Sequence, residues 1–399
     1  MAARGDSTIP FVTAERQVTW VEDRLNAAVN APVIGEVLRA VVLFLCCVVL
    51  VPLSAPIYLV VRIAVILRKA AVNARRVSPA QRVVVITGCD TGFGFDAALE
   101  IARRGFIVVA GCLLPEGKAK LRNAWHHLKK PEDCGSLVPV LCDVTDEGHR
   151  RELLAETHGV IRAGKQHVLH AVINNAGIGS IGSLQQSTDE DWERVFNVNV
   201  FSVAAVTRQF VPLMKENVAR SSGADAVAPR VVNVASQASF AHCMPGCGIY
   251  PASKAAVQGL TQCLHLELAK FGIVACSINP SFHRTKIFQN TLDELANTEA
   301  LPASKRDRLE AAKGAVCLAS RCLWDPKYVV DALVRSVEHR KVEAINPVGM
   351  DGSLVHQNLA AVPFNVFALM WVNVINPIGL HIAEKCWPSG GVSFTKKLK

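Results

Sequence analysis

Charged residues are scarce in this chain. They make up 19% of its 399 residues, whereas hydrophobic residues make up 50%. A disordered chain needs the opposite balance, because it cannot bury enough apolar surface to offset the entropy lost on folding. Tyrosine is also rare, with three residues, and the aromatic residues together make up 6%. The sequence has no stripe in which aromatic and basic residues alternate, as nucleic-acid-binding proteins have, and we expect no nucleic-acid partner.

The 13 cysteines include no C-x-x-C pair, the spacing that many zinc and redox sites use. His242, Cys243 and Cys247 lie close together, but three residues at this spacing offer too few ligands for a structural zinc site. We therefore expect no metal site, and free thiols in a reducing compartment.

The segment 62–82 has no aspartate or glutamate and six lysine or arginine residues. This basic segment follows a run of 22 residues without charge, 40–61. As a helix the run would be about 33 Å long, enough to cross a bilayer. A buried core helix is the alternative, although a soluble helix of this length normally shows a polar face. We predict a transmembrane anchor over residues 40–68, preceded by a flank of residues 1–39.

The charges around the predicted anchor indicate its orientation. Because the basic segment follows the apolar run, the positive-inside rule places the rest of the chain in the cytosol. The chain ends in Lys396, Lys397, Leu398 and Lys399. Lysines at the third and fourth positions from the end resemble the retrieval signal of endoplasmic reticulum membrane proteins, although a lysine-rich end can also be simply solvated. We expect a protein of the endoplasmic reticulum membrane whose main domain faces the cytosol.

From residue 80 onward, short apolar runs alternate with longer amphipathic stretches. Six runs are typical of buried parallel strands: 83–86, 106–110, 138–143, 171–174, 230–236 and 273–279. Four stretches are typical of helices: 95–104, 146–162, 192–215 and 251–270. The alternation predicts an α/β fold with a doubly wound parallel sheet, which binds its ligand at the carboxyl ends of the strands.

The first apolar run leads into a glycine-rich segment, Thr87-Gly88-Cys89-Asp90-Thr91-Gly92-Phe93-Gly94. Its three glycines lie between a strand and a helix, where missing side chains let the backbone turn tightly and approach a pyrophosphate. Gly111-Cys112-Leu113, directly after the second run, supplies neither an acid nor an arginine, so Asp90 is the available partner for an adenosine ribose. A carboxylate there would repel a 2′-phosphate, which favours NAD over NADP.

Two further strand ends carry candidate cofactor contacts. Asp143 closes the third run and is placed to meet the adenine, although a helix N-cap or a solvated turn is an equal alternative. The fourth run ends in Asn174-Asn175-Ala176-Gly177. Small residues at a strand end let the chain pass close to a cofactor, and an ordinary asparagine-glycine turn is the alternative.

The fifth run ends at Ser236, and Tyr250-Pro251-Ala252-Ser253-Lys254 follows. Tyr250 and Lys254 lie four residues apart and therefore share one helix face. An ammonium beside a phenol stabilises the phenolate, so we expect Lys254 to lower the pKa of Tyr250 and make it a proton donor and acceptor near neutral pH. Ser236 is placed to hydrogen-bond a substrate oxygen.

Taken in order, these motifs resemble the short-chain dehydrogenase/reductase family over about residues 80–290. The resemblance implies a dinucleotide-binding catalytic domain there and a homodimer built on the two long helices that follow residues 191 and 250. It implies four catalytic residues: Asn199, Ser236, Tyr250 and Lys254. It implies cofactor contacts from Gly88, Asp90, Gly92, Phe93, Gly94, Asp143, Asn175, Ala176, Gly177 and Lys254. One departure is Pro280-Ser281, where the family has Pro-Gly.

Within the family, the glycine segment resembles that of hydroxysteroid, retinol and D-3-hydroxybutyrate dehydrogenases, which mostly use NAD. Residues 291–399 would cap the substrate, and their apolar segment 362–375 could be core, a lid or a second membrane contact. We expect hydride transfer between NAD and a secondary alcohol or ketone of a lipophilic substrate, a steroid or retinoid. The alternatives are a mitochondrial hydroxybutyrate dehydrogenase, with His283 and Arg284 near the carboxylate, and a non-catalytic scaffold.

Overall fold

The structure, a computed structural model, describes Val60 and residues 76–130, 134–164, 166–180, 184–220, 227–239, 248–284 and 323–349. The chain divides into two compact units, Met1–Ala74 and Arg75–Lys399, and the elements below belong to the second. The predicted anchor, apart from Val60, and the segment 362–375 lie outside the described residues. Among the residues that are described, no helix has both the length and the apolar character that a bilayer crossing needs.

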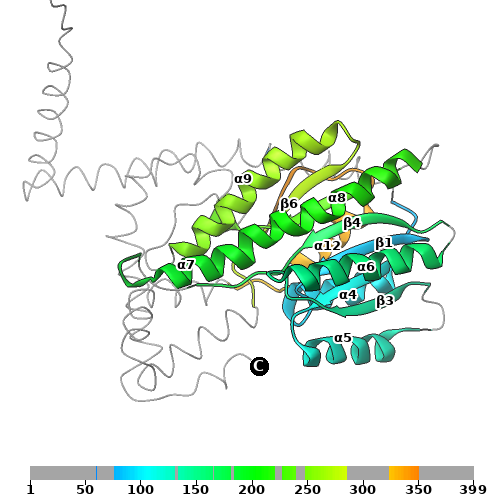
Figure 1. The fold of residues 1–399 in the computed structure, drawn as a ribbon, viewed down its shortest axis with the longest axis horizontal. Coiled ribbons are helices and arrows are strands. Elements are labelled where there is room, and N and C mark those ends of the chain that lie inside the picture. The colour runs from blue at the N-terminus through cyan, green and yellow to red at the C-terminus, as the bar shows by residue number, and fades with distance from the viewer. Residues whose placement is uncertain are drawn as a thin grey trace, which may run out of the picture. The chain divides into compact units, whose positions relative to one another are not determined.

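Seven parallel strands form one sheet in the order β3-β2-β1-β4-β5-β6-β7 (Figure 1). The strands are β1 (Arg82–Thr87), β2 (Ile107–Cys112), β3 (Ser136–Leu141), β4 (Val168–Asn174), β5 (Arg230–Val234), β6 (Val274–Pro280) and β7 (Ile345–Val348). The chain order reverses between β1 and β4, and a doubly wound sheet opens its ligand crevice at such a point. The predicted doubly wound parallel sheet is confirmed.

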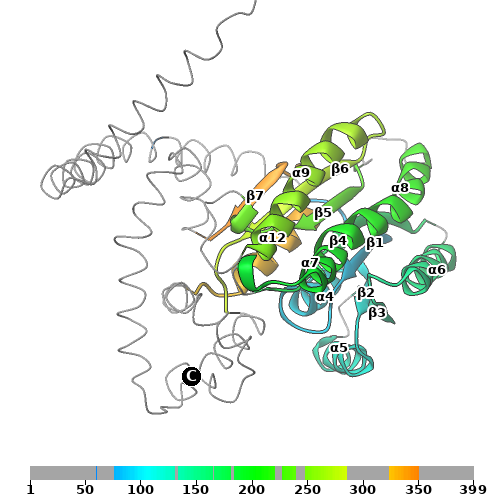
Figure 2. The same cartoon turned by 60° about the vertical axis from the view of Figure 1, so that its left-hand side comes forward.

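Helices cover both faces of the sheet (Figure 2). They are α4 (Gly92–Arg103), α5 (Pro115–Leu128), α6 (Glu147–Ala163), α7 (Asp189–Phe196), α8 (Ser202–Arg220), α9 (Ile249–Ala269) and α12 (Lys327–Glu338). Three single turns complete the described part: the 3-10 turns η2 (Leu184–Gln186) and η4 (Gln237–Ser239) and the π-helical turn η3 (Asn197–Phe201). Apolar residues of α4, α5 and α12 join one core, and those of α6, α8 and α9 join the other.

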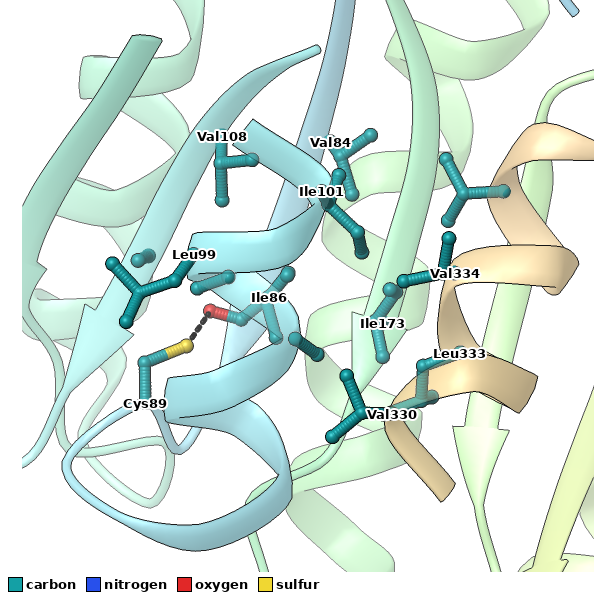
Figure 3. Packing of buried hydrophobic residues seen from close by; sticks show 14 of the residues in the cluster. Val84, Ile86, Cys89, Leu99, Ile101, Val108, Ile173, Val330, Leu333 and Val334 are labelled. Carbon is teal, nitrogen blue, oxygen red and sulfur yellow. Dashed lines mark hydrogen bonds between the residues drawn. The ribbon is translucent and has the colours of Figure 1, made fainter. Parts of the chain in front are cut away.

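Successive side chains along a strand point to opposite faces of the sheet, so each strand contributes residues to both cores. In β1, Val84 and Ile86 belong to the α4 and α12 side, whereas Val83 and Val85 belong to the α6 and α8 side. Strands buried on both faces need apolar residues at every position, which explains the unbroken run VVVI. Figure 3 shows Val84 and Ile86 beside Ile173 of β4, with Leu333 of α12 packed against the same layer.

Three elements differ from the sequence-based prediction. The stretch predicted as one helix, 192–215, is divided by η3 into α7 and α8. The edge helix α5 was missed because its basic residues obscure a narrow apolar stripe of Leu121 and Trp125, which are buried. The edge strand β7 was missed because INPV is short and contains a proline.

A buried arginine fixes the end of α12 on the sheet. Arg230 of β5 is 1% exposed, and its guanidinium donates to the carbonyl oxygens of Ser336 and Arg340 at 2.6 and 3.3 Å. His170 of β4 lies within 2.8 Å of the Val337 carbonyl. Carbonyls at a helix C-terminus carry partial negative charge and have no partner within the helix, so a cation there is favourable. Burial lowers the pKa of Arg230 to about 10, and it stays protonated at neutral pH.

The packing of α12 predicts a matched pair of leucine variants. Leu333→Ala removes a side chain with no exposed surface and should lower the free energy of unfolding by about 2–5 kcal/mol. Leu128→Ala, at the exposed end of α5, is the control and should cost less than about 1 kcal/mol. Urea unfolding followed by circular dichroism measures both. Equal losses for the two variants would show that α12 is not part of the core.

Candidate active site

The glycine-rich segment forms a turn between β1 and α4 in which backbones approach closely. Gly88 has a φ of +71°, and a Cβ on it would lie 2.7 Å from the Cα of Ala176. A Cβ on Gly94 would overlap the carbonyl oxygen of Gly88 and the amide of Asn175. Gly92 has a φ of +64° but open space around it. The three glycines are therefore needed for two different reasons, a left-handed backbone and close packing.

The end of β4 is locked onto this turn by hydrogen bonds. The hydroxyl of Thr87 accepts the backbone N–H groups of Asn175 and Ala176, both at 3.1 Å. The Asn175 side chain donates to the carbonyl oxygens of Thr87 and Gly88 at 3.0 and 2.9 Å. Asn175 and Ala176 thus shape the turn, and the Thr87 hydroxyl is a contributor that the sequence analysis missed.

Asp90 has a structural role in addition to the one predicted for it. Its two carboxylate oxygens accept the backbone N–H groups of Leu113 and Leu114 at 2.8 and 2.9 Å. A Cβ on Gly117 would overlap the same carboxylate. Asp90 therefore ties the glycine turn to the loop between β2 and α5.

Asp143 forms a local turn after β3. Its Oδ1 accepts the backbone N–H and the hydroxyl of Thr145 at 2.8 and 2.6 Å. The N-cap of α6 is Asp146, whose side chain accepts the N–H of His149. The N-cap alternative for Asp143 is therefore wrong, and its partly buried carboxylate holds the turn that follows β3.

Phe93 lies at the start of α4, and its ring meets the ring of His283 edge to face with centroids 5.7 Å apart. His283 is 3% exposed, and its Nδ1 lies 3.0 Å from the carbonyl oxygen of Ser281. This contact joins the glycine turn to the loop after β6. The sequence analysis considered His283 only as a charge for a substrate, and the structure adds its packing on Phe93.

Asn199 lies within η3 and is 1% exposed. Its side chain accepts the N–H of Ile178 at 2.8 Å and donates to the Ile178 carbonyl at 3.0 Å. It also donates to the hydroxyl of Ser253 on α9 at 3.0 Å. A π-helical turn widens the helix locally and is frequent at functional sites. Here the turn lets one side chain bind both the end of β4 and α9.

Lys254 of α9 is buried between the end of β5 and Gly177, which follows β4. Its Nζ donates to the carbonyl oxygen of Val234 at 2.9 Å and lies 5.8 Å from the centre of the Tyr250 ring. A Cβ on Gly177 would lie 3.3 Å from both this Nζ and the Asn199 Oδ1. Lys254, Asn199 and Gly177 therefore converge on one point. Burial lowers the pKa of Lys254 to about 8.

Tyr250 is partly buried at the start of α9, and Ser236 is the side chain whose hydrogen bonding acts on its pKa. Burial raises the pKa of Tyr250, and the hydrogen bond from Ser236 opposes part of that rise. The expected lowering of this pKa by Lys254 is not seen. The ammonium is drawn to the Val234 carbonyl, and the desolvation of the phenol dominates. The two side chains do share one helix face, as the spacing predicts.

The sequence model of the short chain dehydrogenase family matches residues 82–296. The chain belongs to the short chain dehydrogenase family.

Two curated relatives illustrate the likeness. Retinol dehydrogenase 16 of Mus musculus is 30% identical over 312 residues, which cover 74% of this chain and 90% of the relative. Retinol dehydrogenase 5 of Homo sapiens is 33% identical over 218 residues, which cover 54% of this chain and 60% of the relative. The match to retinol dehydrogenase 5 thus spans less than two thirds of that protein.

Solved structures share the fold at low sequence identity. A short chain dehydrogenase/reductase from Burkholderia phymatum, in complex with NAD, aligns with a TM-score of 0.57 at 24% identity and covers 73% of this chain and 96% of that one. A 3-ketoacyl-(acyl-carrier-protein) reductase from Brucella melitensis, complexed with NADH, aligns with a TM-score of 0.53 at 22% identity. It covers 67% of this chain and 96% of that one.

Replacing a glycine by alanine should have opposite effects in the glycine turn and on the open surface of α6. Gly94→Ala forces a methyl group into the Gly88 carbonyl and Asn175, so it should lower the free energy of unfolding by about 1–3 kcal/mol and weaken dinucleotide binding. Gly159→Ala, in open space on α6, should raise stability by about 0.5–1 kcal/mol. Thermal unfolding with and without NAD measures both. A neutral Gly94→Ala would contradict the close approach.

The buried Lys254 predicts a pH dependence of stability. Its pKa is about 8 in the folded chain and about 10.4 in an unfolded one, so its burial cost is complete below pH 8 and is relieved as the pH rises toward 10.4. Relative to Lys254→Met, the wild-type chain should gain up to about 3 kcal/mol over this window. Urea unfolding at several pH values tests this, and parallel pH curves for the two proteins would contradict it.

Proposed function

We propose that this chain is an NAD-dependent oxidoreductase that acts on a CH–OH group. One observation supports the proposal: Lys254 and Asn199 both lie beside Gly177, which follows β4, and Lys254 shares its face of α9 with Tyr250, whose pKa Ser236 lowers. This is the crevice of a doubly wound sheet, where such proteins bind their ligands. A scaffold without catalysis would not need a buried lysine at this point, since burying an ammonium costs free energy.

In the proposed reaction Tyr250 and Ser236 hold the substrate hydroxyl, and the Tyr250 phenolate accepts its proton as the C–H hydride leaves. NAD, when bound, supplies the hydride acceptor. The Ser236 hydroxyl lowers the cost of the phenolate by donating a hydrogen bond to it. Lys254 supplies positive charge below its pKa of about 8, and Asn199 links α9 to the end of β4. Reduction of a ketone uses the same groups in reverse.

The residues of the crevice fit a dinucleotide. The glycine turn leaves space for a pyrophosphate at the N-terminus of α4, with Gly88, Gly92, Phe93 and Gly94 as the proposed contacts. Asn175, Ala176, Gly177 and Lys254 would border the nicotinamide half, and Asp143 the adenine. The Asp90 carboxylate disfavours a 2′-phosphate, which supports NAD over NADP. Two solved structures with this fold carry NAD or NADH, which also supports the proposal.

A lipophilic steroid or retinoid with a secondary alcohol or ketone is the proposed substrate. The uncharged run at 40–61 followed by the basic segment supports a membrane anchor, and the curated relatives named above are retinol dehydrogenases. We place the protein in the endoplasmic reticulum membrane with its catalytic domain in the cytosol, as a homodimer. A mitochondrial location is the alternative outcome of cell fractionation.

The hydroxybutyrate alternative gains no support from the described residues. It needs a cation that can receive a carboxylate, and His283 and Arg284 were its candidates. His283 is buried against Phe93, and Arg284 lies 3.7 Å from the carboxylate of Asp325. A substrate carboxylate would therefore have to displace an ion pair that Arg284 already makes.

Removing one hydroxyl tests the proposed reaction. Tyr250→Phe should lower kcat by about 10²–10⁴-fold, because the general acid–base group is lost. NAD affinity should stay within about threefold of wild type, since the glycine turn is untouched. NADH fluorescence with estradiol, retinol and hydroxybutyrate in turn measures turnover in membranes that contain the protein. Normal turnover by the variant would overturn the assignment, and Tyr328→Phe, at an exposed tyrosine, is the matched control.

A further inference from the structure

Helix α9 carries a third buried side chain, Gln258, on the face that holds Tyr250 and Lys254. Tyr250, Lys254 and Gln258 are spaced four residues apart and occupy one face of the helix. Tyr250 hydrogen-bonds Ser236, and Lys254 donates to the Val234 carbonyl. Gln258 is 4% exposed, and its Oε1 accepts a hydrogen bond from Asn279 of β6 at 3.0 Å. The helix face that carries Tyr250 and Lys254 therefore also contacts β6, through Gln258.

Asn279 is fully buried at the end of β6, and both atoms of its amide are engaged. Its Nδ2 donates to the backbone carbonyl of Ser236 at 3.2 Å as well as to Gln258. Its Oδ1 accepts the Ser277 hydroxyl at 2.8 Å. Its own carbonyl accepts the Gln237 side chain at 3.0 Å. One amide thus joins β6 and α9 to the residue that hydrogen-bonds Tyr250.

The remaining contacts of Ser236 show why this amide matters. The Ser236 hydroxyl accepts the N–H of Ala238 at 3.1 Å and lies 3.5 Å from the carbonyl of Pro280, the neighbour of Asn279. The Ser236 carbonyl also accepts the N–H of Ser239 at 3.0 Å. The contact with Pro280 is long, so it holds the hydroxyl weakly. Asn279 joins the Ser236 carbonyl to Gln258 of α9, and Ser239 forms a second link, because its N–H donates to the same carbonyl and its hydroxyl donates to the Lys254 carbonyl at 2.9 Å.

We propose that Asn279, acting with Gln258, is a positioning residue that sets the place of Ser236 relative to Tyr250. This inference rests on the proposed function. The Asn279 amide touches no reacting atom. It acts by holding the Ser236 carbonyl and the α9 face at a fixed separation, so that the serine hydroxyl meets the phenol and the substrate oxygen together. A displacement of about 1 Å in such a group can cost about 10²-fold in rate.

A second buried amide gives a matched control. Asn233 of β5 is also fully buried; it donates to the Thr261 hydroxyl at 2.8 Å and accepts from Asn174 at 2.8 Å. None of these hydrogen bonds reaches Ser236, Tyr250 or Lys254. Asn233→Ala should therefore lower stability about as much as Asn279→Ala does, without moving the serine.

The experiment compares Asn279→Ala, Gln258→Ala, the double variant and Asn233→Ala in the full chain. Asn279→Ala should lower kcat by about 10–100-fold with KM within about threefold, because orientation is lost and binding is not. The double variant should lose no more than Asn279→Ala alone, since the two side chains act as one unit. The acidic limb of the oxidation pH profile should move to higher pH, because the Ser236 bond that lowers the pKa of Tyr250 is weakened.

Hydrogen–deuterium exchange supplies a readout that needs no turnover. Exchange in residues 235–239 should rise in Asn279→Ala and stay at the wild-type level in Asn233→Ala. An equal fall in kcat for both variants, or unchanged exchange in Asn279→Ala, would overturn the positioning role. If the wild-type chain oxidises none of the alcohols tested, the proposed function fails, and the exchange comparison alone decides whether Asn279 holds Ser236.

Discussion

Close backbone contact between the glycine turn and the end of β4 is the constraint on which the crevice depends. Gly94 has no room for a Cβ between Gly88 and Asn175, and Gly88 faces the backbone of Ala176. The Thr87 hydroxyl and the Asn175 amide then satisfy the polar groups that this contact buries. The contact lies where the strand order reverses, which is the point at which a doubly wound sheet opens its ligand crevice.

Desolvation governs the electrostatics on the α9 side of the crevice. Burial raises the pKa of Tyr250 and lowers that of Lys254, so both groups are driven toward their neutral forms. The Val234 carbonyl and the Ser236 hydroxyl compensate part of this cost. The crevice therefore buries a phenol and an amine at the expense of stability, which is common where ionisable groups serve chemistry.

Much of the fold and the set of candidate residues could be predicted because their signals are local. Runs such as VVVI identify strands buried on both faces, and the i, i+4 spacing places Tyr250 and Lys254 on one helix face. The structure brings Asn199, Lys254 and Gly177 together as the motifs indicate. Two elements at the edges of the sheet were missed. The strand β7 has only four residues, and the apolar residues of α5 are interrupted by basic ones.

The sequence by itself determined strands β1 to β6, helices α4, α6 and α9, the glycine turn and the tyrosine–lysine face, because each depends on neighbours along the chain. Only the tertiary structure decided which hydrogen bonds those residues make. Asp90 binds the amides of Leu113 and Leu114, and Asn279 binds Ser236 and Gln258 across 43 and 21 positions. No local pattern encodes such pairs, since they arise when separate strands end at the same edge of one sheet and leave buried polar groups to satisfy.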